Sequence, residues 1–581
     1  MNTQRSPNEL VDRFLHNLRI SLSRPDAMVQ LAVLGLSTGV VSGVVIVAFR
    51  LVVESLQVSL LPSMMVESFE SLPIWWRIGF PVLGALLIAL IFKLFAAGEY
   101  LVGVVHVLER LAYHQGKLNL RGLLLQFTVA SIAIISGHSV GREGPSIHLG
   151  AASSSLIGQG LGLPTNTLRT LVACGCAAAI AASFNTPLAG VILTLEVIMM
   201  EYTAASFTPI ILAAVSATAV SRAFYGAEPA SSVPSLELVS LMELPYMFVV
   251  GIIIGTASAL LIWLTKWFAQ RGNNTSLWLR LTMAGLLTGV CGAAYPQIMG
   301  IGYDTVSQAL LGELGITLLL GVIFFKIIAT AGAIGLGVPA GIIGPTLFIG
   351  ASIGALMGIA AQILSDGASS HSGLYALLGM GAMMGATLQA PLAALTAVVE
   401  LTYNPNIILP GMLTIVAAGL TSRQLFSQRS IFTTLIRCRG LDYSHDPILQ
   451  AMRRVGVASV MNRRVQRQSD LVKRSTAEEL MSKHPDWIVI DQDGQPTTLL
   501  RALDLARYMK ESKDTNIDLL KIPAKRLQVT SVPLQASVDE ALKRLNETQA
   551  DAIYVERITA PGIRRIYGVL TREALEDSYH L

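Results

Sequence analysis

Residues 141 to 145 read Gly-Arg-Glu-Gly-Pro inside a stretch that is otherwise apolar enough to lie in lipid. An ionised carboxylate at the centre of a membrane helix costs roughly 2.5–3.5 kcal/mol even on a lenient insertion scale, so Glu143 needs a partner, water or a proton. One role is a salt bridge to Arg142, although side chains at consecutive positions do not readily face each other on a helix. The other role is a carboxylate that takes up and releases a proton in an ion pathway.

Two glycine-proline pairs, Gly144-Pro145 and Gly344-Pro345, precede apolar runs in the manner of helix starts. A helix that begins inside a membrane leaves its first backbone N–H groups without intrahelical partners, and its dipole places partial positive charge there. Proline suits the first helical turn, and glycine lets a ligand approach the backbone. We therefore expect the two starts to face one anion. An ionised Glu143 would compete with that anion, and a protonated Glu143 would free the site.

The two starts belong to an internal repeat. GPSIHLGAASSSLIG from Gly144 matches GPTLFIGASIGALMG from Gly344 at an offset of 200 residues. Further on, NTPLAGVILTLEV at 185–197 matches QAPLAALTAVVEL at 389–401 at an offset of 204. Membrane duplications often run in inverted topology and meet at a midplane site built from discontinuous helices. The alternative explanation of the match is helix packing by small residues.

The composition is that of a membrane protein. Of the 581 residues, 52% are hydrophobic and 14% are charged, and the mean hydropathy is +0.58. Soluble proteins carry about a quarter charged residues. Several apolar runs are shorter than the roughly 20 residues that cross a bilayer as one helix, so we expect some helices to be tilted, partial or broken. The net charge of +4 gives no indication of nucleic-acid binding.

Charged residues gather near the C-terminus, where 39 of the 80 lie after residue 450. Arginines before the first apolar run predict a cytoplasmic N-terminus, and a cytoplasmic C-terminal domain then implies an even number of crossings. The absence of a signal-peptide pattern suits a bacterial inner (plasma) membrane. The predicted parts are an N-terminal segment at 1–27, a transmembrane domain at 28–440 with repeats at 78–225 and 280–440, and a cytoplasmic domain at 441–581.

In these motifs the chain resembles the CLC family of voltage-gated chloride channels and chloride–proton antiporters. Residues 141–145 match its GREGP motif, whose Glu is the gating glutamate, and GVPAGIIGP at 337–345 looks like the region of its GxFxP motif. The segment 185–196 looks like the one that leads to its internal proton-transfer position. The resemblance covers roughly residues 30 to 440. It implies an all-α polytopic membrane protein with an inverted-repeat fold, which forms a homodimer in the bilayer with one pathway per subunit gated by Glu143.

The resemblance also implies a set of residues around the anion, which are Gly141, Arg142, Gly144, Pro145, Val102, Gly341, Ile342, Ile343 and Phe432. Arg142 is expected to be structural or to supply positive potential. Val102 stands at the family's serine that contacts the central chloride, and Phe432 at its central tyrosine, so two hydroxyl donors are replaced by apolar groups. Ile343 stands at the Phe of GxFxP. We expect backbone N–H groups to hold the anion, with weaker binding or an altered anion preference.

The best-known antiporters of the family carry a second acid, the internal proton glutamate, where this chain has Val197. Many family channels lack that acid, and so do some antiporters. Glu196 is either a substitute proton group or a helix-capping carboxylate like Glu400 of the other repeat. The chain is therefore expected to be a gated chloride channel or a proton-coupled chloride antiporter. A solute transporter of another class with the same inverted-repeat plan is the third alternative.

Other chemistry finds little support in the sequence. His106, His138 and His148 lie near the motifs, and histidine titrates near neutral pH, but without a supporting constellation they are expected to be packing residues. The four cysteines indicate neither a disulfide framework nor a metal site. We expect no enzyme activity, no metal and no cofactor, with chloride as the transported ion.

From about residue 457 the pattern changes to strands and amphipathic helices, in an order that resembles a pair of CBS domains at 457–512 and 524–581. Such pairs often bind adenine nucleotides through a Gly-x-x-Thr-x-x-Asp turn. Gly568 and Thr571 fit this pattern, but Ala574 stands at the Asp position. Nucleotide binding is one hypothesis for this domain, and a role in dimerisation or stability is the default.

Overall fold

The computed structural model describes residues 19, 21–22, 27–62, 66–96, 102–202, 204–226, 238–273, 275–366, 369–441, 452–453, 455–492, 494–560 and 563–577. The predicted N-terminal segment at 1–27 lies almost entirely outside the described residues, as do residues 99–101 before Val102. The chain divides into two compact units. The first holds Ala32–Ile157 and Arg169–Ser444, and the second holds Met1–Leu31, Gly158–Leu168 and His445–Leu581.

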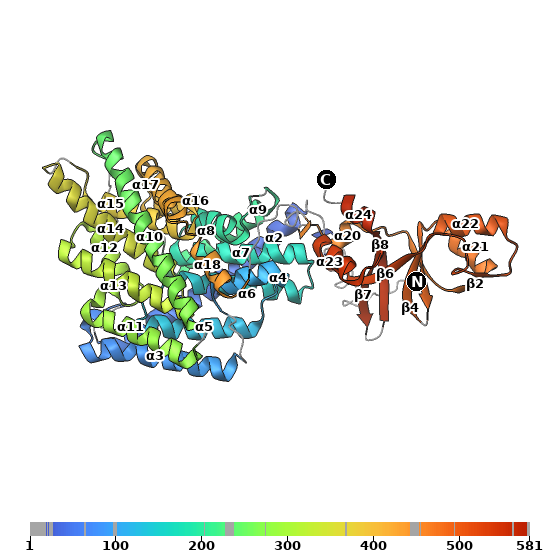
Figure 1. Cartoon of the computed structure of the whole chain (residues 1–581), viewed down its shortest axis with the longest axis horizontal. Helices are drawn as coiled ribbons and strands as arrows, with labels where there is room; N and C mark the ends of the chain where they lie inside the picture. Colours follow the sequence, from blue (N-terminus) through green and yellow to red (C-terminus); the bar gives the residue numbers. More distant parts are fainter. Residues whose placement is uncertain are drawn as a thin grey trace. The chain divides into compact units, whose positions relative to one another are not determined.

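The first unit is built from helices (Figure 1). Its α-helices are α2 (Met28–Leu60), α3 (Ile74–Phe95), α4 (Gly103–Tyr113), α5 (Leu120–Ile135), α6 (Glu143–Gly160), α7 (Thr165–Phe184), α8 (Pro187–Leu193), α9 (Ala204–Tyr225), α10 (Leu244–Gly272), α11 (Leu277–Ala294), α12 (Tyr303–Leu311), α13 (Ile316–Gly335), α14 (Ile343–Leu364), α15 (Ser372–Leu388), α16 (Pro391–Thr402), α17 (Ile408–Leu420) and α18 (Ile431–Cys438). Short 3-10 or π segments join them at η1 (Phe69–Ser71), η2 (Thr194–Met199), η3 (Leu241–Glu243), η4 (Pro296–Ile298), η5 (Pro405–Ile407) and η6 (Thr421–Leu425).

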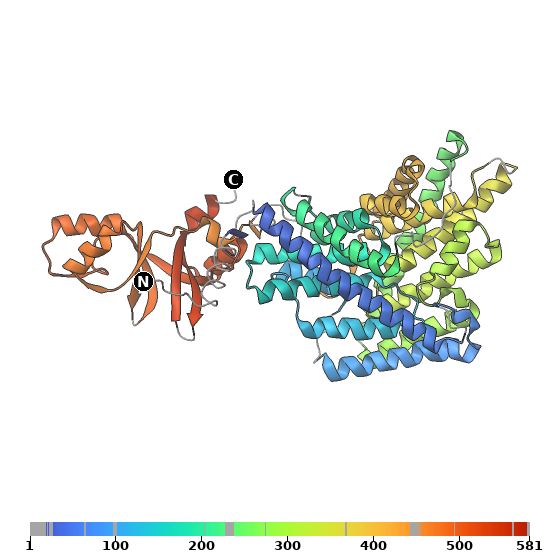
Figure 2. The same cartoon turned by 180° about the vertical axis from the view of Figure 1, so that it is seen from behind.

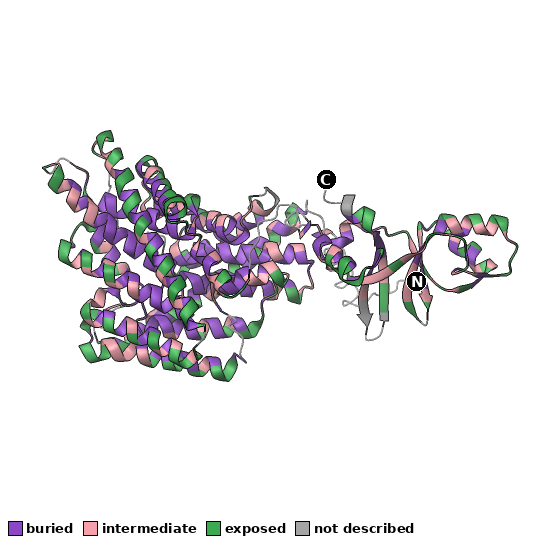
Figure 3. Ribbon diagram, viewed as in Figure 1, coloured by how far each residue is buried: buried purple, intermediate pink, exposed green. Residues whose placement is uncertain are grey.

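Many of these helices suit a bilayer. Within the described part of the chain, nine helices are long and apolar enough to cross a membrane, and α5, α8 continued by η2, α15 and α16 are apolar but shorter. Their outer faces carry large exposed apolar side chains, for example Trp75 at 80% exposure. Figure 3 shows this distribution, with exposed residues on the outside of the helices and buried residues between them. Soluble proteins rarely expose so extensive an apolar surface, whereas contact with lipid is favourable for it. The expectation of a polytopic membrane protein with partial helices is confirmed.

Small residues let the helices approach each other closely. Figure 2 shows α2 running obliquely across the unit. Gly35 and Gly39 of α2 lie against the backbone of Pro209 and Ala213 in α9, where a Cβ on either glycine would collide with it. Lipid supplies no hydrophobic drive between helices, so this close backbone packing is a main source of their association.

The internal repeat predicted from the sequence is also present in the backbone. Gly137 and Gly337, 200 residues apart, both have positive φ, at 78° and 95°. Each donates its N–H to a carbonyl three residues back, at 3.1 Å, and so ends the preceding helix in the same way. Gly141 and Gly341 then pair as an antiparallel bridge. The antiparallel pairing of equivalent glycines is the relation expected of an inverted repeat.

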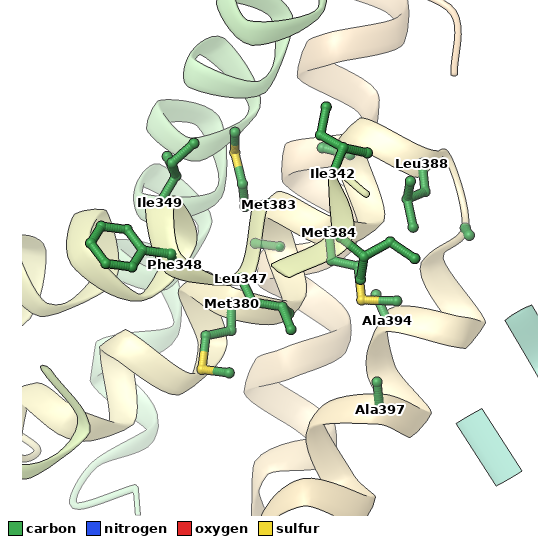
Figure 4. Close-up of a cluster of buried hydrophobic side chains, with 14 of the residues drawn as sticks. Ile342, Leu347, Phe348, Ile349, Met380, Met383, Met384, Leu388, Ala394 and Ala397 are labelled. Atoms are coloured by element: carbon green, nitrogen blue, oxygen red, sulfur yellow. The ribbon is translucent and has the colours of Figure 1, made fainter. Parts of the chain in front are cut away.

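The core beside the second break is apolar and rich in methionine. Figure 4 shows Ile342 and Phe348 near the start of α14 together with Met380, Met383 and Met384 of α15. Phe348 and Met383 are fully buried, and the other three are at most 5% exposed. Methionine fills irregular gaps well, which suits a core next to a broken helix.

The second unit is an α/β domain. Its described helices are α20 (Val457–Val460), α21 (Arg474–Ser482), α22 (Ala502–Glu511), α23 (Val538–Thr548) and α24 (Arg572–Asp577). Its strands are β1 (Val465–Ser469), β2 (Leu471–Lys473), β3 (Trp487–Gln492), β4 (Gln495–Arg501), β5 (Asn516–Asp518), β6 (Leu527–Pro533), β7 (Ala552–Ala560) and β8 (Ile563–Thr571). Six strands form one sheet in the order β1-β3-β4-β6-β7-β8, and β2 pairs with β5.

The two halves of this sheet have the same connectivity. β1 is parallel to β3, which forms a hairpin with β4, and β6 is parallel to β7, which forms a hairpin with β8. A helix lies between the parallel strands of each half, and another follows each hairpin. β4 and β6 pair antiparallel and join the halves. This duplicated α/β arrangement confirms the predicted fold class.

The Thr571 hydroxyl accepts the N–H of Ala574 at 3.3 Å, so it caps α24.

Candidate functional site

The two helix breaks lie side by side. Gly141 donates its N–H to the carbonyl of Gly341 at 2.7 Å, and Gly341 donates to the carbonyl of Gly141 at 2.8 Å. α6 and α14 begin two residues later in each repeat. A Cβ on Gly144 would lie only 2.7 Å from the Cα of Gly341, which explains the glycine. The structure thus brings together the two helix starts that the sequence predicted to meet.

The Glu143 side chain is bound at the start of the other repeat's helix. It is fully buried, and its Oε2 accepts the N–H of Gly344 at 3.1 Å. Its Oε1 accepts the hydroxyl of Tyr303 at 2.5 Å. The N-terminus of α14 carries partial positive charge and free N–H groups, which attract an anion. The carboxylate therefore lies where a mobile anion would bind.

Arg142 has other partners. Its Nη1 lies 3.3 Å from Oε1 of Glu54, and its Nη2 donates to the carbonyl of Ser183 at 3.4 Å. Its guanidinium carbon lies 5.3 Å from the ring centroid of Tyr303. Among the described residues Arg142 forms its ion pair with Glu54 and not with Glu143. The positive charge thus stays beside the carboxylate without neutralising it by direct contact.

Sequence reasoning missed Tyr303, the first residue of α12. The segment before it is held by a carboxylate, because Glu67 accepts the N–H groups of Ile301, Gly302 and Tyr303 at 3.1–3.2 Å. Glu67 therefore accepts the free N–H groups at the N-terminus of α12, as Glu143 accepts one at the start of α14. No local motif marks either residue, because Glu67 and Tyr303 are far apart in the chain.

Lys326 holds the same segment from its other side. The side chain is fully buried in α13, and its Nζ donates to the carbonyls of Ile298, Gly300 and Ile301 at 2.9–3.3 Å. A lysine in a predicted membrane helix was a signal that sequence reasoning left unused, since such a group needs buried partners. The position of Tyr303 is thus fixed through backbone donors and acceptors.

A cavity of about 630 Å³ opens against the same breaks. Of the predicted anion residues, Val102, Gly341, Ile342 and Phe432 line it, whereas Gly141, Arg142, Gly144, Pro145 and Ile343 do not. Its charged and histidine side chains are mostly basic, and they are His106, Glu109, Arg110, His114, Arg280 and Arg439. An excess of positive groups in a low-dielectric hollow raises the local concentration of anions.

At the start of α4 the backbone is hydrogen-bonded by the side-chain amide of Gln126, and no side-chain hydroxyl is present at Val102. Val102 precedes the helix, is buried, and offers no side-chain donor. Gln126 Oε1 accepts the N–H of Gly103 at 2.5 Å, and its Nε2 donates to the carbonyl of Pro339 at 3.0 Å. Gln126 and Lys326 are 200 residues apart, so equivalent positions of the two repeats both bind backbone near a helix start.

Glu196 and Glu400 cap each other's repeats. Glu196 accepts the N–H groups of Leu392 and Ala393 at 3.4 and 2.8 Å, at the start of α16. Glu400 accepts those of Leu188 and Ala189 at 2.9 and 2.7 Å, at the start of α8. This reciprocal arrangement is the helix-capping alternative for Glu196. The neighbouring Val197 is buried at 3% exposure.

Comparisons with known proteins agree on one family. The family model described as voltage gated chloride channel matches residues 84–423. A chloride channel protein named ClcB-like, from Ralstonia nicotianae, is 32% identical over 364 residues, which cover 62% of this chain and 85% of that protein. The H(+)/Cl(-) exchange transporter ClcA of Salmonella arizonae is 29% identical over 310 residues, which cover 52% of this chain and 65% of that one.

Two solved structures have a similar fold. The crystal structure of a slow cyanobacterial Cl-/H+ antiporter aligns with a TM-score of 0.61 at 23% identity and covers 70% of this chain and 97% of its own. The crystal structure of a eukaryotic CLC transporter aligns with a TM-score of 0.60 at 19% identity and covers 97% of this chain and 98% of its own. The second alignment therefore includes the α/β unit as well as the helical one.

The reciprocal caps predict matched losses of stability. Replacing either Glu196 or Glu400 by glutamine removes a charged acceptor pair from two N–H groups, which is worth about 1–2 kcal/mol. We expect Glu196→Gln and Glu400→Gln to lower the thermal unfolding midpoint of the detergent-purified protein by similar amounts. The control Glu313→Gln, at an exposed acid, is expected to leave the midpoint unchanged. A loss in Glu400→Gln without one in Glu196→Gln would contradict reciprocal capping.

Proposed function

The chain belongs to the voltage-gated chloride channel family, and we propose that it transports chloride across a membrane along a pathway gated by Glu143. The observation that carries this proposal is the hydrogen bond from the Gly344 N–H to the Glu143 carboxylate. A carboxylate bound at a helix start occupies a site that is electrostatically suited to a small anion. Movement of that carboxylate would leave the N–H groups for chloride.

The basic cavity supports an anion as the transported ion. Arg110, Arg280 and Arg439 line it, as do Gly341 and Ile342 of the second helix break. Val102 and Phe432 line the cavity without hydroxyl groups. Backbone N–H groups are therefore the main direct donors that we propose for the anion, and affinity for it is expected to be modest.

The gate requires a proton to open. An ionised Glu143 is attracted to the start of α14, and protonation removes the charge on which that attraction depends. The neutral side chain can leave, and chloride takes its place. Because the proton is then carried by the gate itself, we propose that chloride moves in exchange for protons. Relatives named H(+)/Cl(-) exchange transporter support this mode.

A passive gated channel is the second candidate. One observation favours it: the position after Glu196, where the best-known antiporters carry the internal proton glutamate, holds Val197. In a channel, Glu143 would still open and close the path, but no continuous proton route would cross the protein. The two candidates differ in whether protons move in proportion to chloride.

We also propose the setting of the protein. The bacterial relatives support a multi-pass protein of the inner membrane, and the arginines before the first apolar run support cytoplasmic termini. The family resemblance supports a homodimer with one pathway in each subunit. For the α/β unit we favour dimerisation or stability over adenine-nucleotide binding, because Thr571 caps α24 and Ala574 has no carboxylate.

The test of the gate is Glu143→Gln in proteoliposomes. Chloride efflux and external pH are recorded together for the wild type and the variant. In exchange, the wild type takes up protons as chloride leaves, and we expect the variant to lose proton movement because glutamine cannot carry the proton. Chloride efflux from the variant is expected to continue without its dependence on pH.

Each outcome of that experiment separates the candidates. Chloride efflux from the wild type without proton movement would overturn exchange and establish the passive channel. Transport of neither chloride nor another halide by correctly inserted protein would overturn anion transport altogether. The exposed-acid variant Glu313→Gln serves as the matched control and is expected to behave as the wild type does.

Tyr303→Phe is expected to speed chloride turnover. The phenylalanine keeps the ring beside Arg142 but removes the hydroxyl that donates to Glu143. Loss of one hydrogen bond to a charged group, worth about 1.5 kcal/mol, weakens the closed state and should raise turnover roughly tenfold if gate release limits the rate. Tyr375→Phe is the matched control, because its hydroxyl donates to Glu243 at the same 2.5 Å. Equal rates in Tyr303→Phe and the wild type would contradict the role of Tyr303.

A further inference from the structure

His106 and His148, which the sequence analysis treated as packing residues, form a buried pair. His106 lies in α4 and is 2% exposed, and His148 lies in α6 and is fully buried. Nδ1 of His106 lies 3.0 Å from Nε2 of His148. The ring centroids are 5.2 Å apart, and the ring planes are 28° from parallel. The two rings are thus joined by a direct nitrogen-to-nitrogen hydrogen bond.

The neighbouring arginine sets the direction of this hydrogen bond. Arg110 Nε lies 3.0 Å from Nε2 of His106, and a guanidinium can only donate. In the neutral pair, Nε2 of His106 is therefore the acceptor, its proton lies on Nδ1, and that proton is donated to His148. By the same reasoning, the proton of His148 lies on its Nδ1. The chain of donors runs from Arg110 through His106 to His148.

The far end of this chain is an unpaired buried donor. Within the described residues, Nδ1 of His148 is buried and has no hydrogen-bond partner. An unsatisfied buried polar group costs about 1–3 kcal/mol, so the unpaired Nδ1 of His148 lowers the stability of the folded protein. A packing role for His148 explains neither the pairing with His106 nor this unpaired nitrogen.

The pair extends from the cavity toward the helix of the gate. Both His106 and Arg110 line the cavity. His148 belongs to α6, whose first residue is Glu143. Glu143 and His148 are five positions apart in one α-helix, so their Cα atoms lie about 9 Å apart. The sequence position at which the family's best-known antiporters carry an internal acid holds Val197, so a proton route through this chain needs another titratable group.

We propose that His106 and His148 relay protons between the cavity and Glu143, an inference that rests on the proposed proton–chloride exchange. When Arg110 turns away, a proton from water in the cavity binds Nε2 of His106. The proton on Nδ1 of His106 passes to Nε2 of His148, and the proton on Nδ1 of His148 leaves toward the carboxylate of Glu143. Both rings are then neutral with the proton on Nε2, and the starting state returns when each Nδ1 takes up a proton and each Nε2 releases one.

Arg110 links this relay to chloride. The charged or titratable groups that act on His106 are His148 in α6, Arg110 in the same helix, His114 just after it, and Arg439 after α18. The positive charges of Arg110 and Arg439 disfavour a positive charge on the His106 ring. Chloride in the cavity attracts the Arg110 guanidinium and offsets its charge, so the arrival of an anion favours protonation of His106. Anion and proton movements are coupled at this point.

The test uses His106→Gln and His148→Gln in proteoliposomes, with chloride efflux and proton uptake recorded together. We expect the ratio of protons to chloride to fall by about tenfold or more, because loss of a proton-transfer group typically costs at least that. Chloride efflux is expected to continue, which also shows that the variants fold. His138→Gln is the matched control, since His138 is fully buried, has an unpaired Nε2, and hydrogen-bonds Ser136.

The outcomes distinguish the relay from the exchange on which it rests. If the wild type and both variants move protons and chloride in the same ratio, exchange stands and the relay is wrong. If the wild type itself moves chloride without protons, exchange fails and the relay fails with it. An equal loss of both fluxes in the variants would assign the pair a structural role and overturn the relay. Should His148→Gln not fold, His106→Gln alone decides by the same criteria.

Discussion

The rest of the helical unit depends on the hydrogen bond from the Gly344 N–H to the buried carboxylate of Glu143. A carboxylate in an apolar interior needs donors, and the first N–H groups of a buried helix start need acceptors. Each requirement satisfies the other here. Because the two groups come from different repeats, the chain must bring both helix starts to one place, and it does so through the paired backbones of Gly141 and Gly341.

The duplication solves several similar problems in the same way. Glu196 and Glu400 each satisfy the first N–H groups of a helix in the opposite repeat. Gln126 and Lys326, at equivalent positions, bind backbone beside α4 and α12. A side chain that serves as a helix-end ligand therefore recurs throughout the fold. Glu143 differs from the others because Tyr303 also binds it and a basic cavity lies beside the same breaks.

Local sequence patterns predicted the features of this fold that depend on residues close together in the chain. The charged residue in an apolar run and the Gly-Pro starts predicted Glu143 and the breaks, and the repeat predicted that the breaks would meet. Partners from distant segments had no such signal. Tyr303 and Glu67 lie far from Glu143 and from each other in the chain, and only the folded backbone brings them together.

The histidines show the same limit at the level of function. His106 and His148 were visible near the motifs, but neither position indicated a contact between them, which depends on how α4 packs against α6. Of the predicted anion residues, Val102, Gly341, Ile342 and Phe432 line the cavity, whereas Gly144 lies against the backbone of Gly341 in the contact between repeats. Sequence patterns identified the right segments, and packing decided which face of each segment is open.

We propose that the Glu143 carboxylate occupies an anion site at the start of α14. The most direct test of this proposal is the crystal structure of Glu143→Ala grown in bromide, with anomalous diffraction used to locate the ion. We expect a bromide peak within hydrogen-bonding distance of the Gly344 N–H, in the place of the missing carboxylate. Bromide bound elsewhere in the cavity, with none at Gly344, would contradict it.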